Sequence, residues 1–224
     1  MTTISPQRNQ FLSELAVADY QQLLPSLHTV LLKRGQILYA QDSSPDFIYF
    51  PVSVVISFVV ELSDGFSIEA VALGKESIVG AAIPATGSVG ILKVRDEGIA
   101  FKVKVTKFDH LLKNISVSKV VTKFNIGIIE MMMRNIACVR HHKLIQQLCR
   151  WILNSLNSAK LATITISHAE LGHTLGVRRE AISLTLNELA LSGAVELKRN
   201  HIEVVDREIL EKMVCECYWA SITQ

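Results

Sequence analysis

The amino-acid sequence predicts an α+β protein in which a β-rich half precedes a helical half, and three observations support this prediction. Residues 31–105 hold short β-branched runs separated by turn residues. Residues 117–138 carry apolar side chains at a heptad spacing, which is typical of one long helix. Residues 168–192 contain two short amphipathic segments around a glycine. We therefore expect two domains, at residues 1–139 and 140–224.

The composition excludes several classes of protein. Hydrophobic residues make up 49% and charged residues 20% of the 224 residues, which permits a sizeable core and excludes wholesale disorder. The net charge of +2 is too small to indicate nucleic acid or a membrane as a partner by itself. The N-terminus lacks the apolar core of a signal peptide, and the longest apolar stretch, about 51–60, is far shorter than the roughly 20 residues that span a bilayer. Four unevenly spaced cysteines do not suggest a disulfide scaffold, so we expect a cytoplasmic protein with no membrane partner.

Within the β-rich half, the apolar runs at residues 52–62 and 66–73 predict a hairpin. Asp64 and Gly65 lie between the two runs and supply the positive φ that a tight turn demands. Further glycines follow at a similar spacing, which favours an antiparallel barrel or jelly roll over alternating β-α-β units. Before these strands, residues 9–24 have the apolar spacing of a helix.

The heptad pattern of residues 117–138 allows two interpretations. The helix could pack against its own β domain, or it could form the seam of a coiled-coil dimer. The pattern persists for about three heptads, which favours the dimer, and Asn135 within it would fix the register. The predicted dimerisation residues are Val117, Val121, Phe124, Ile128, Met131, Asn135 and Cys138.

Residues 168–192 have the pattern of a helix-turn-helix. Gly176 stands where the chain must turn sharply between two short helices. Gly172, four places earlier, lets the helices cross closely, and Ile182, six places after the turn glycine, would lock the angle between them. An ordinary corner between two helices is the alternative interpretation.

A hairpin with a basic tip is expected after the second helix. Residues 195–197 and 201–205 are short apolar runs on either side of Lys198, Arg199 and Asn200. A wing of this kind can reach DNA phosphates while the second helix enters the major groove.

With these motifs the chain resembles the Crp/Fnr family of bacterial transcription regulators over nearly its whole length. The resemblance is carried by LGVRREAISLTLNEL, by the basic hairpin and by the tail VVDREILEKMVCECY. It implies a cyclic-nucleotide-binding-like sensory β-roll, a dimerisation helix at about residues 109–139 and a winged helix-turn-helix at residues 140–224. It also implies a homodimer that binds double-stranded DNA at a pseudo-palindromic operator, with RNA polymerase as a further partner and a hinge near residues 140–143.

The resemblance also assigns residues to the DNA interface. Arg179 and Glu180 match the pair that reads base edges in the family, whereas Leu184 stands where a further arginine is common. The remaining predicted DNA contacts, to phosphates or bases, are Arg178, Ser183, His168, Lys198 and Arg199. The alternative is a ligand-binding or scaffold protein whose helix-turn-helix is only structural, in which case Arg179→Ala would leave DNA affinity unchanged.

The effector of the expected sensory domain is unknown. Cyclic-AMP-binding relatives use a Gly-Glu pair followed by an Arg-Ser pair, but here Ala81 follows Gly80 and no Arg-Ser pair occurs in residues 78–98, so cyclic AMP is not expected. No cysteine precedes Cys138, so an iron–sulfur cluster in this domain is not expected either. Haem stays open, because His28 and His110 are available as ligands.

The sequence gives little indication of catalysis or of a metal site. An enzyme on a jelly-roll scaffold would need clustered histidine and carboxylate ligands, and residues 31–105 contain no histidine, so we predict no enzyme. Cys215 and Cys217 would point about 200° apart on a helix, which suits neither a shared metal nor a disulfide. We interpret them as packing residues, with thiol sensing as the alternative, and predict no metal ligand.

Overall fold

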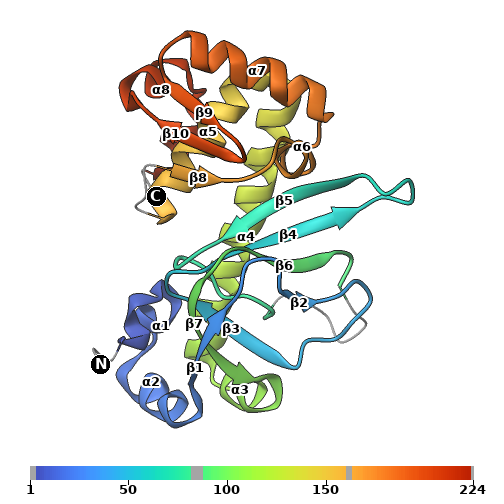
Figure 1. Ribbon diagram of the computed structural model, residues 1–224. Coiled ribbons are helices and arrows are strands. Elements are labelled where there is room, and N and C mark those ends of the chain that lie inside the picture. The colour runs from blue at the N-terminus through green and yellow to red at the C-terminus, as the bar shows by residue number, and fades with distance from the viewer. Residues whose placement is uncertain (1–3, 82–87, 160–162, 223–224) are drawn as a thin grey trace. The chain divides into compact units, whose positions relative to one another are not determined.

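The computed structural model describes residues 4–81, 88–159 and 163–222. The chain divides into two compact units (Figure 1): residues 1–60 and 70–130 make the first, and residues 61–69 and 131–224 make the second. The boundary between the units falls within one long helix. None of the helices in the described parts of the chain has both the length and the apolar character needed to span a bilayer.

Two antiparallel sheets form the β-rich half and confirm the predicted mixed fold. The three-stranded sheet has the order β1-β7-β3, with bounds His28–Leu32, Gly98–Lys104 and Phe47–Pro51. The four-stranded sheet has the order β2-β6-β4-β5, with bounds Ile37–Tyr39, Ile91–Asp96, Val55–Glu61 and Ser67–Leu73. The turn between β4 and β5 has Gly65 at a φ of 82°, as the predicted hairpin requires.

Short helices at the start of the chain, together with one that follows β7, cover the core of the first unit. The predicted helix over residues 9–24 is instead two helices, because Leu15 and Ala16 have extended backbones that end the helical hydrogen bonding. Phe11 is fully buried at the centre of this core, where its ring lies 5.6 Å from that of Phe50 and 5.5 Å from that of Phe124. The helical elements are η1 (Pro6–Arg8), α1 (Gln10–Glu14), α2 (Val17–Leu23), η2 (Leu24–Ser26) and α3 (Val105–Leu112).

A long helix forms as predicted, but α4 (Ile115–His141) begins later than the expected residue 109, because residues 105–112 belong to the separate helix α3. Val117, Val121 and Phe124 are at most 8% exposed and belong to the core of the first unit. Cys138 is fully buried within the second unit. These four side chains pack within their own chain, and their assignment to a dimer interface stays a prediction. Ile128 and Met131 are half-buried, and the Asn135 side chain accepts a 2.8 Å hydrogen bond from Arg150.

The second unit places a helix-turn-helix and a three-stranded sheet on the long helix α5 (Leu144–Ala159). Its core is mainly aliphatic, with Leu148, Ile152 and Leu171 fully buried, and also contains Trp151 and Tyr218. The sheet has the order β8-β10-β9, in which every pairing is antiparallel. The other elements are β8 (Thr163–Thr165), α6 (His168–Leu175), α7 (Arg179–Leu191), β9 (Val195–Lys198), β10 (His201–Val204), α8 (Arg207–Met213) and α9 (Glu216–Ile222).

Candidate nucleic-acid interface

The turn between α6 and α7 has the backbone geometry that the two glycines were predicted to supply. Gly176 ends α6 in the left-handed conformation, at a φ of 68°. A Cβ atom on Gly172 would lie 2.8 Å from the carbonyl oxygen of Val177, a distance to backbone that real side chains do not adopt. The helices therefore approach each other as closely as the sequence pattern required.

Both helices are positioned by local sequence signals. Ser167 caps α6 and forms a reciprocal capping box with Glu170. On α7, Ile182, Leu186 and Leu189 are fully buried, so the opposite face of the helix is fixed toward solvent. The helix begins directly after Arg178, and its first turn presents Arg179 and Glu180 as exposed side chains.

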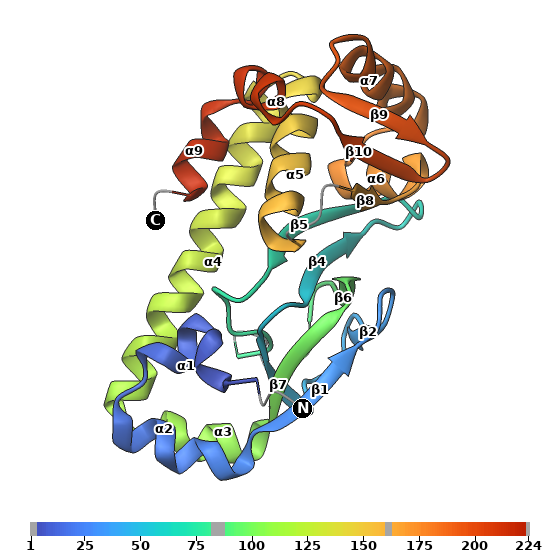
Figure 2. The ribbon, with the colours of Figure 1, turned by 60° about the vertical axis from the view of Figure 1, so that its left-hand side comes forward.

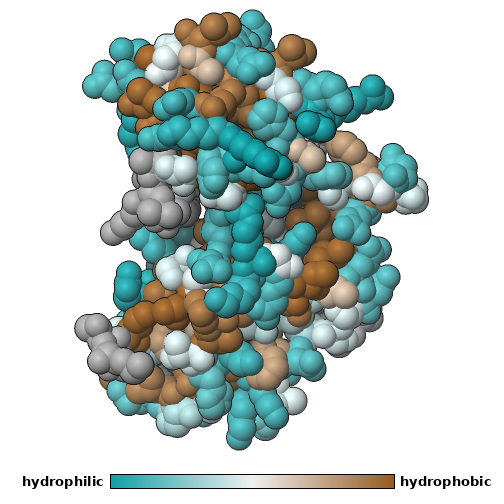
Figure 3. All heavy atoms as spheres, in the orientation of Figure 1, coloured by the Kyte–Doolittle hydropathy of each residue, from teal (hydrophilic) through white to brown (hydrophobic). Residues whose placement is uncertain are grey.

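Four residues on the outer face of α7 line a shallow hollow of about 370 Å³: Arg179, Glu180, Ser183 and Leu184. This hollow combines a cation, a carboxylate, a hydroxyl and an apolar side chain, which are the groups that read base edges. Leu184 is 73% exposed and Leu191 is 90% exposed. The surface over α7, at the top of Figure 3, accordingly mixes hydrophobic and hydrophilic patches.

Ser183 and His168 form a hydrogen-bonded pair that joins α7 to the start of α6. The Ser183 hydroxyl donates to the carbonyl of Arg179 at 3.1 Å, and its oxygen lies 2.8 Å from Nδ1 of His168. The tautomer of His168 decides which of these two atoms supplies the proton of the second hydrogen bond. The two predicted phosphate contacts are thus brought together by the fold.

The basic hairpin forms as predicted, with Arg199 and Asn200 in its turn and Asn200 at a φ of 59°. The positive charge of Lys198 is compensated by two carboxylates, because its Nζ lies 2.6 Å from Glu203 and 3.7 Å from Glu196. The hydrogen bond to Glu203, together with the negative charge of Glu196, raises the pKa of Lys198 above its ordinary value. Arg199 is exposed at the tip.

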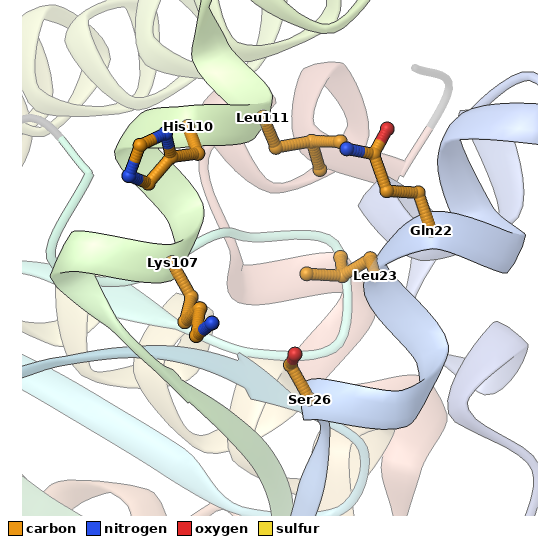
Figure 4. Close-up of a pocket in the computed structure, with 6 residues that line it drawn as sticks. All are labelled: Gln22, Leu23, Ser26, Lys107, His110 and Leu111. Atoms are coloured by element: carbon orange, nitrogen blue, oxygen red, sulfur yellow. The ribbon is translucent and has the colours of Figure 1, made fainter.

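The first unit has a small surface hollow of about 210 Å³ between α2, η2 and α3 (Figure 4). Its volume lies below the roughly 300–1,000 Å³ of typical small-molecule pockets. His110 lies on its wall and, like His28 on β1, is exposed. Residues 82–87, which belong to the segment compared with the cyclic-AMP cassette, lie outside the described residues, so the prediction on cyclic AMP stays a prediction.

Comparisons with known proteins agree with this geometry. The family profile described as the Crp-like helix-turn-helix domain matches residues 142–213. Among curated proteins, none matches the sequence. A Crp/Fnr-family transcriptional regulator from Eubacterium rectale has 16% identity and a TM-score of 0.77, over 92% of this chain and 98% of its own. FixK2 from Bradyrhizobium japonicum has 14% identity and a TM-score of 0.70, over 84% of this chain and 98% of its own.

A third similar structure is the c-di-GMP-responsive global regulator CLP from Xanthomonas campestris. It has 14% identity and a TM-score of 0.69, over 85% of this chain and 100% of its own. At these identities the likeness concerns the fold, and it extends over both compact units. Residues 142–213 are therefore a Crp-like helix-turn-helix domain, and the chain as a whole has the fold of the Crp/Fnr transcription regulators.

Proposed function

We propose that the protein is a sequence-specific transcription regulator that binds a pseudo-palindromic operator as a homodimer. The observation that carries the proposal is the asymmetry of α7. One face is fully buried through Ile182, Leu186 and Leu189. The other presents Arg179 and Glu180 at the N-terminal end of the helix, where recognition helices contact base edges.

The outer face of α7 suits base reading in the major groove. The exposed Arg179 can bind O6 and N7 of a guanine through two hydrogen bonds, and Glu180 can accept a hydrogen bond from N4 of a cytosine. Leu184 stands where related proteins often have an arginine, and as an exposed apolar side chain it suits the methyl group of a thymine. The operator half-site is therefore expected to contain thymine where those relatives select guanine.

Backbone contacts would position the reading helix. Arg178 at the N-cap of α7 and Arg199 at the hairpin tip are exposed cations that can bind phosphates. Lys198 is a weaker candidate, because two carboxylates already compensate its charge. His168 and Ser183 would have to exchange their mutual hydrogen bond for one to a phosphate oxygen.

A different stripe of α4 supports the homodimer. Ile126, Ile129, Met133 and Ile136 are 50–65% exposed and follow a 3-4-3 spacing, which is the spacing of a coiled-coil seam. The helix therefore has one apolar stripe buried in its own chain and a second that faces solvent. A second copy related by two-fold symmetry would cover the exposed stripe and bring two recognition helices to major grooves about 34 Å apart.

A charged residue in this exposed stripe is expected to prevent dimerisation. Ile129→Glu would place two like charges within the interface between the copies, but would leave the single chain folded because Ile129 is 54% exposed. Sedimentation velocity should then give a monomer at concentrations at which the wild type is a dimer. Val17→Glu is the matched control, because Val17 is 79% exposed on α2 and lies outside the stripe. A dimer of unchanged affinity in Ile129→Glu would exclude this seam.

The function is tested by selecting bound duplexes from a random DNA library. The expected result is a two-fold symmetric site whose half-site centres are about 10–10.5 base pairs apart, or a multiple of that distance. The selection is repeated with added small molecules from cells, because the effector is not assigned. Failure to enrich any sequence under both conditions would favour the alternative, in which the helix-turn-helix is only structural.

The first unit would act as the sensory domain and α4 as the element that transmits its state. A ligand can shift the DNA-binding equilibrium only if it binds one state of the protein more tightly than the other. Cyclic AMP and an iron–sulfur cluster are not proposed for this domain, since Ala81 replaces the cassette glutamate and no cysteine precedes Cys138. Contact with RNA polymerase is part of the proposed function and is not assigned to a surface.

A further inference from the structure

Four potential metal ligands converge within the second unit, at a place that the proposed DNA-binding function does not use. Cys138 lies in the last turn of α4 and His142 directly follows that helix, while Cys215 directly precedes α9 and Cys217 lies in its first turn. Their ligand atoms all lie within 4.8 Å of one another. Figure 2 shows α9 alongside the C-terminal half of α4.

The structure removes the geometric argument for interpreting the Cys-x-Cys pair as packing residues only. That interpretation placed both cysteines on one helix, where their side chains would diverge. In the structure α9 begins at Glu216, so Cys215 precedes the helix and only Cys217 lies in it. The two thiols are therefore free to face the same point.

Two of the distances between these ligand atoms match the edges of a tetrahedron around one zinc ion. Zinc binds cysteine sulfur at about 2.3 Å and histidine nitrogen at about 2.0–2.1 Å, which gives edges of about 3.8 Å between two sulfurs and about 3.6 Å between sulfur and nitrogen. Sγ of Cys138 lies 3.6 Å from Sγ of Cys215. Sγ of Cys217 lies 3.8 Å from Nδ1 of His142. One cysteine–histidine pair and one cysteine–cysteine pair are thus already at the separation that a shared ion requires.

The orientation of His142 is a second and independent observation. Its Nε2 lies 3.0 Å from a carboxylate oxygen of Glu216, on the side of the ring away from the thiol at Nδ1. A histidine that binds a metal through one nitrogen usually donates the proton of the other to a carboxylate. Glu216 would hold the Nε2 proton and so keep Nδ1 unprotonated for the ion.

The cysteines do not behave as ordinary core residues. Cys138, Cys215 and Cys217 are 0–9% exposed and form a small cluster of their own, apart from the aliphatic core of the unit. The fourth cysteine, Cys149, is packed among the leucines and isoleucines of that core. A disulfide between Cys138 and Cys215 would use one pair only and would give no role to Cys217 or to the orientation of His142.

We propose that Cys138, His142, Cys215 and Cys217 bind one Zn²⁺ ion in a tetrahedral structural site. Three thiolates and one imidazole are a ligand set typical of structural zinc. The ion would join the end of α4 to α9 and so fix the C-terminal tail within the DNA-binding unit. An iron–sulfur cluster fits less well, because its thiolates bind different irons, whereas the four ligand atoms here lie within 4.8 Å of one another.

The first experiment measures metal in full-length protein purified without chelator. The expected content is about one zinc per chain in the wild type and in Cys149→Ala, with zinc absent from Cys215→Ser. Cobalt added to metal-free wild type should give the intense visible bands of tetrahedral Co²⁺ and thiolate-to-cobalt charge transfer, which does not require any variant to fold. The proposal is overturned if the purified protein contains no zinc and its cobalt spectrum lacks these features. An iron–sulfur chromophore, or a Cys138–Cys215 disulfide in protein that binds no metal, also overturns it.

The second experiment tests the role assigned to Glu216. Glu216→Gln should lower zinc affinity about 10–100-fold in competition with a chelator, since the partner of a ligating histidine tunes its metal binding by that amount. Glu208→Gln is the control, because Glu208 is an exposed glutamate on the neighbouring helix α8. Equal zinc affinity in both variants would overturn ligation by His142 Nδ1. These measurements require no DNA, so they are independent of the proposed operator binding.

Discussion

Arg179→Ala is expected to remove the preference for one base pair in each operator half-site while leaving the protein folded. Arg179 is exposed in the first turn of α7 and contributes nothing to the buried face of the helix. A bidentate arginine–guanine interaction accounts for about 1–3 kcal/mol of discrimination against other bases. A two-fold symmetric site contains this interaction twice, so the discrimination should fall by about 2–6 kcal/mol in total.

The measurement is a parallel selection of duplexes by the wild type and the variant, followed by binding curves at several salt concentrations. Arg199→Ala is the informative comparison, because an interaction with a phosphate carries no base information. It should weaken the binding of all sequences alike and reduce the salt slope by about 0.9 for each phosphate that is no longer neutralised. A selected site that is the same for Arg179→Ala and the wild type would show that α7 does not read bases through this residue.

The helix-turn-helix could be predicted residue by residue because its determinants are local. The positive φ at Gly176 and the close approach at Gly172 both arise within ten residues of chain, and the buried positions of α7 follow the helical period. The β4–β5 hairpin was predictable for the same reason, since Asp64 and Gly65 specify its turn. Where one residue type satisfies one backbone requirement, the sequence pattern is sufficient.

The sequence could not show which apolar stripe of α4 faces solvent, because two such stripes share this helix. Over about three heptads, the difference between a 3.5-residue and a 3.6-residue repeat is too small to separate a coiled-coil seam from a face buried in its own core. The stripe that includes Val117 and Val121 follows the heptad more regularly, yet it packs against Phe11 and its neighbours. Only the tertiary structure shows that Ile129 and Met133 are the exposed pair.

The thiol cluster was missed for a different reason. Cys138 and Cys215 are 77 residues apart in the chain, and the spacing within each half of the cluster is ambiguous by itself. The informative signal was the boundary of α9, which determines whether the Cys-x-Cys pair diverges or converges. Helix boundaries are the feature that local patterns specify least well.

A buried amide in the first unit was not indicated by any sequence pattern. Asn9 is 0% exposed, and the two protons on its Nδ2 are shared among the backbone carbonyls of Pro51 at 2.9 Å, Lys75 at 3.1 Å and Ser77 at 2.9 Å. Its Oδ1 accepts a hydrogen bond from the backbone N–H of Leu12, which caps α1. One side chain therefore joins the first helix to three separate points of the β-rich unit.

Asn9→Asp is expected to destabilise the first unit by about 3–5 kcal/mol at neutral pH. The change keeps the shape of the side chain, but it replaces the donor amide by a carboxylate that faces three carbonyl oxygens in a buried site. The matched control is Asn187→Asp, which makes the same substitution at an exposed position and should alter stability by less than about 0.5 kcal/mol. Denaturant unfolding followed by far-ultraviolet circular dichroism is the suitable measurement, because both tryptophans, Trp151 and Trp219, lie in the second unit.

The pH dependence of Asn9→Asp separates the loss of hydrogen bonds from a simple packing defect. Burial and the surrounding carbonyl oxygens disfavour the charged carboxylate, so the folded-state pKa of the introduced carboxyl should lie above the value of about 3.9 in the unfolded chain. The folded variant then holds a proton that the unfolded variant releases, and its stability falls as the pH rises from the unfolded-state pKa to the folded-state pKa. The deficit relative to wild type should therefore be smallest at about pH 4 and largest near neutrality. A deficit that does not change with pH would mean that the carboxylate escapes to solvent, and that the amide of Asn9 does not hold the three carbonyls together.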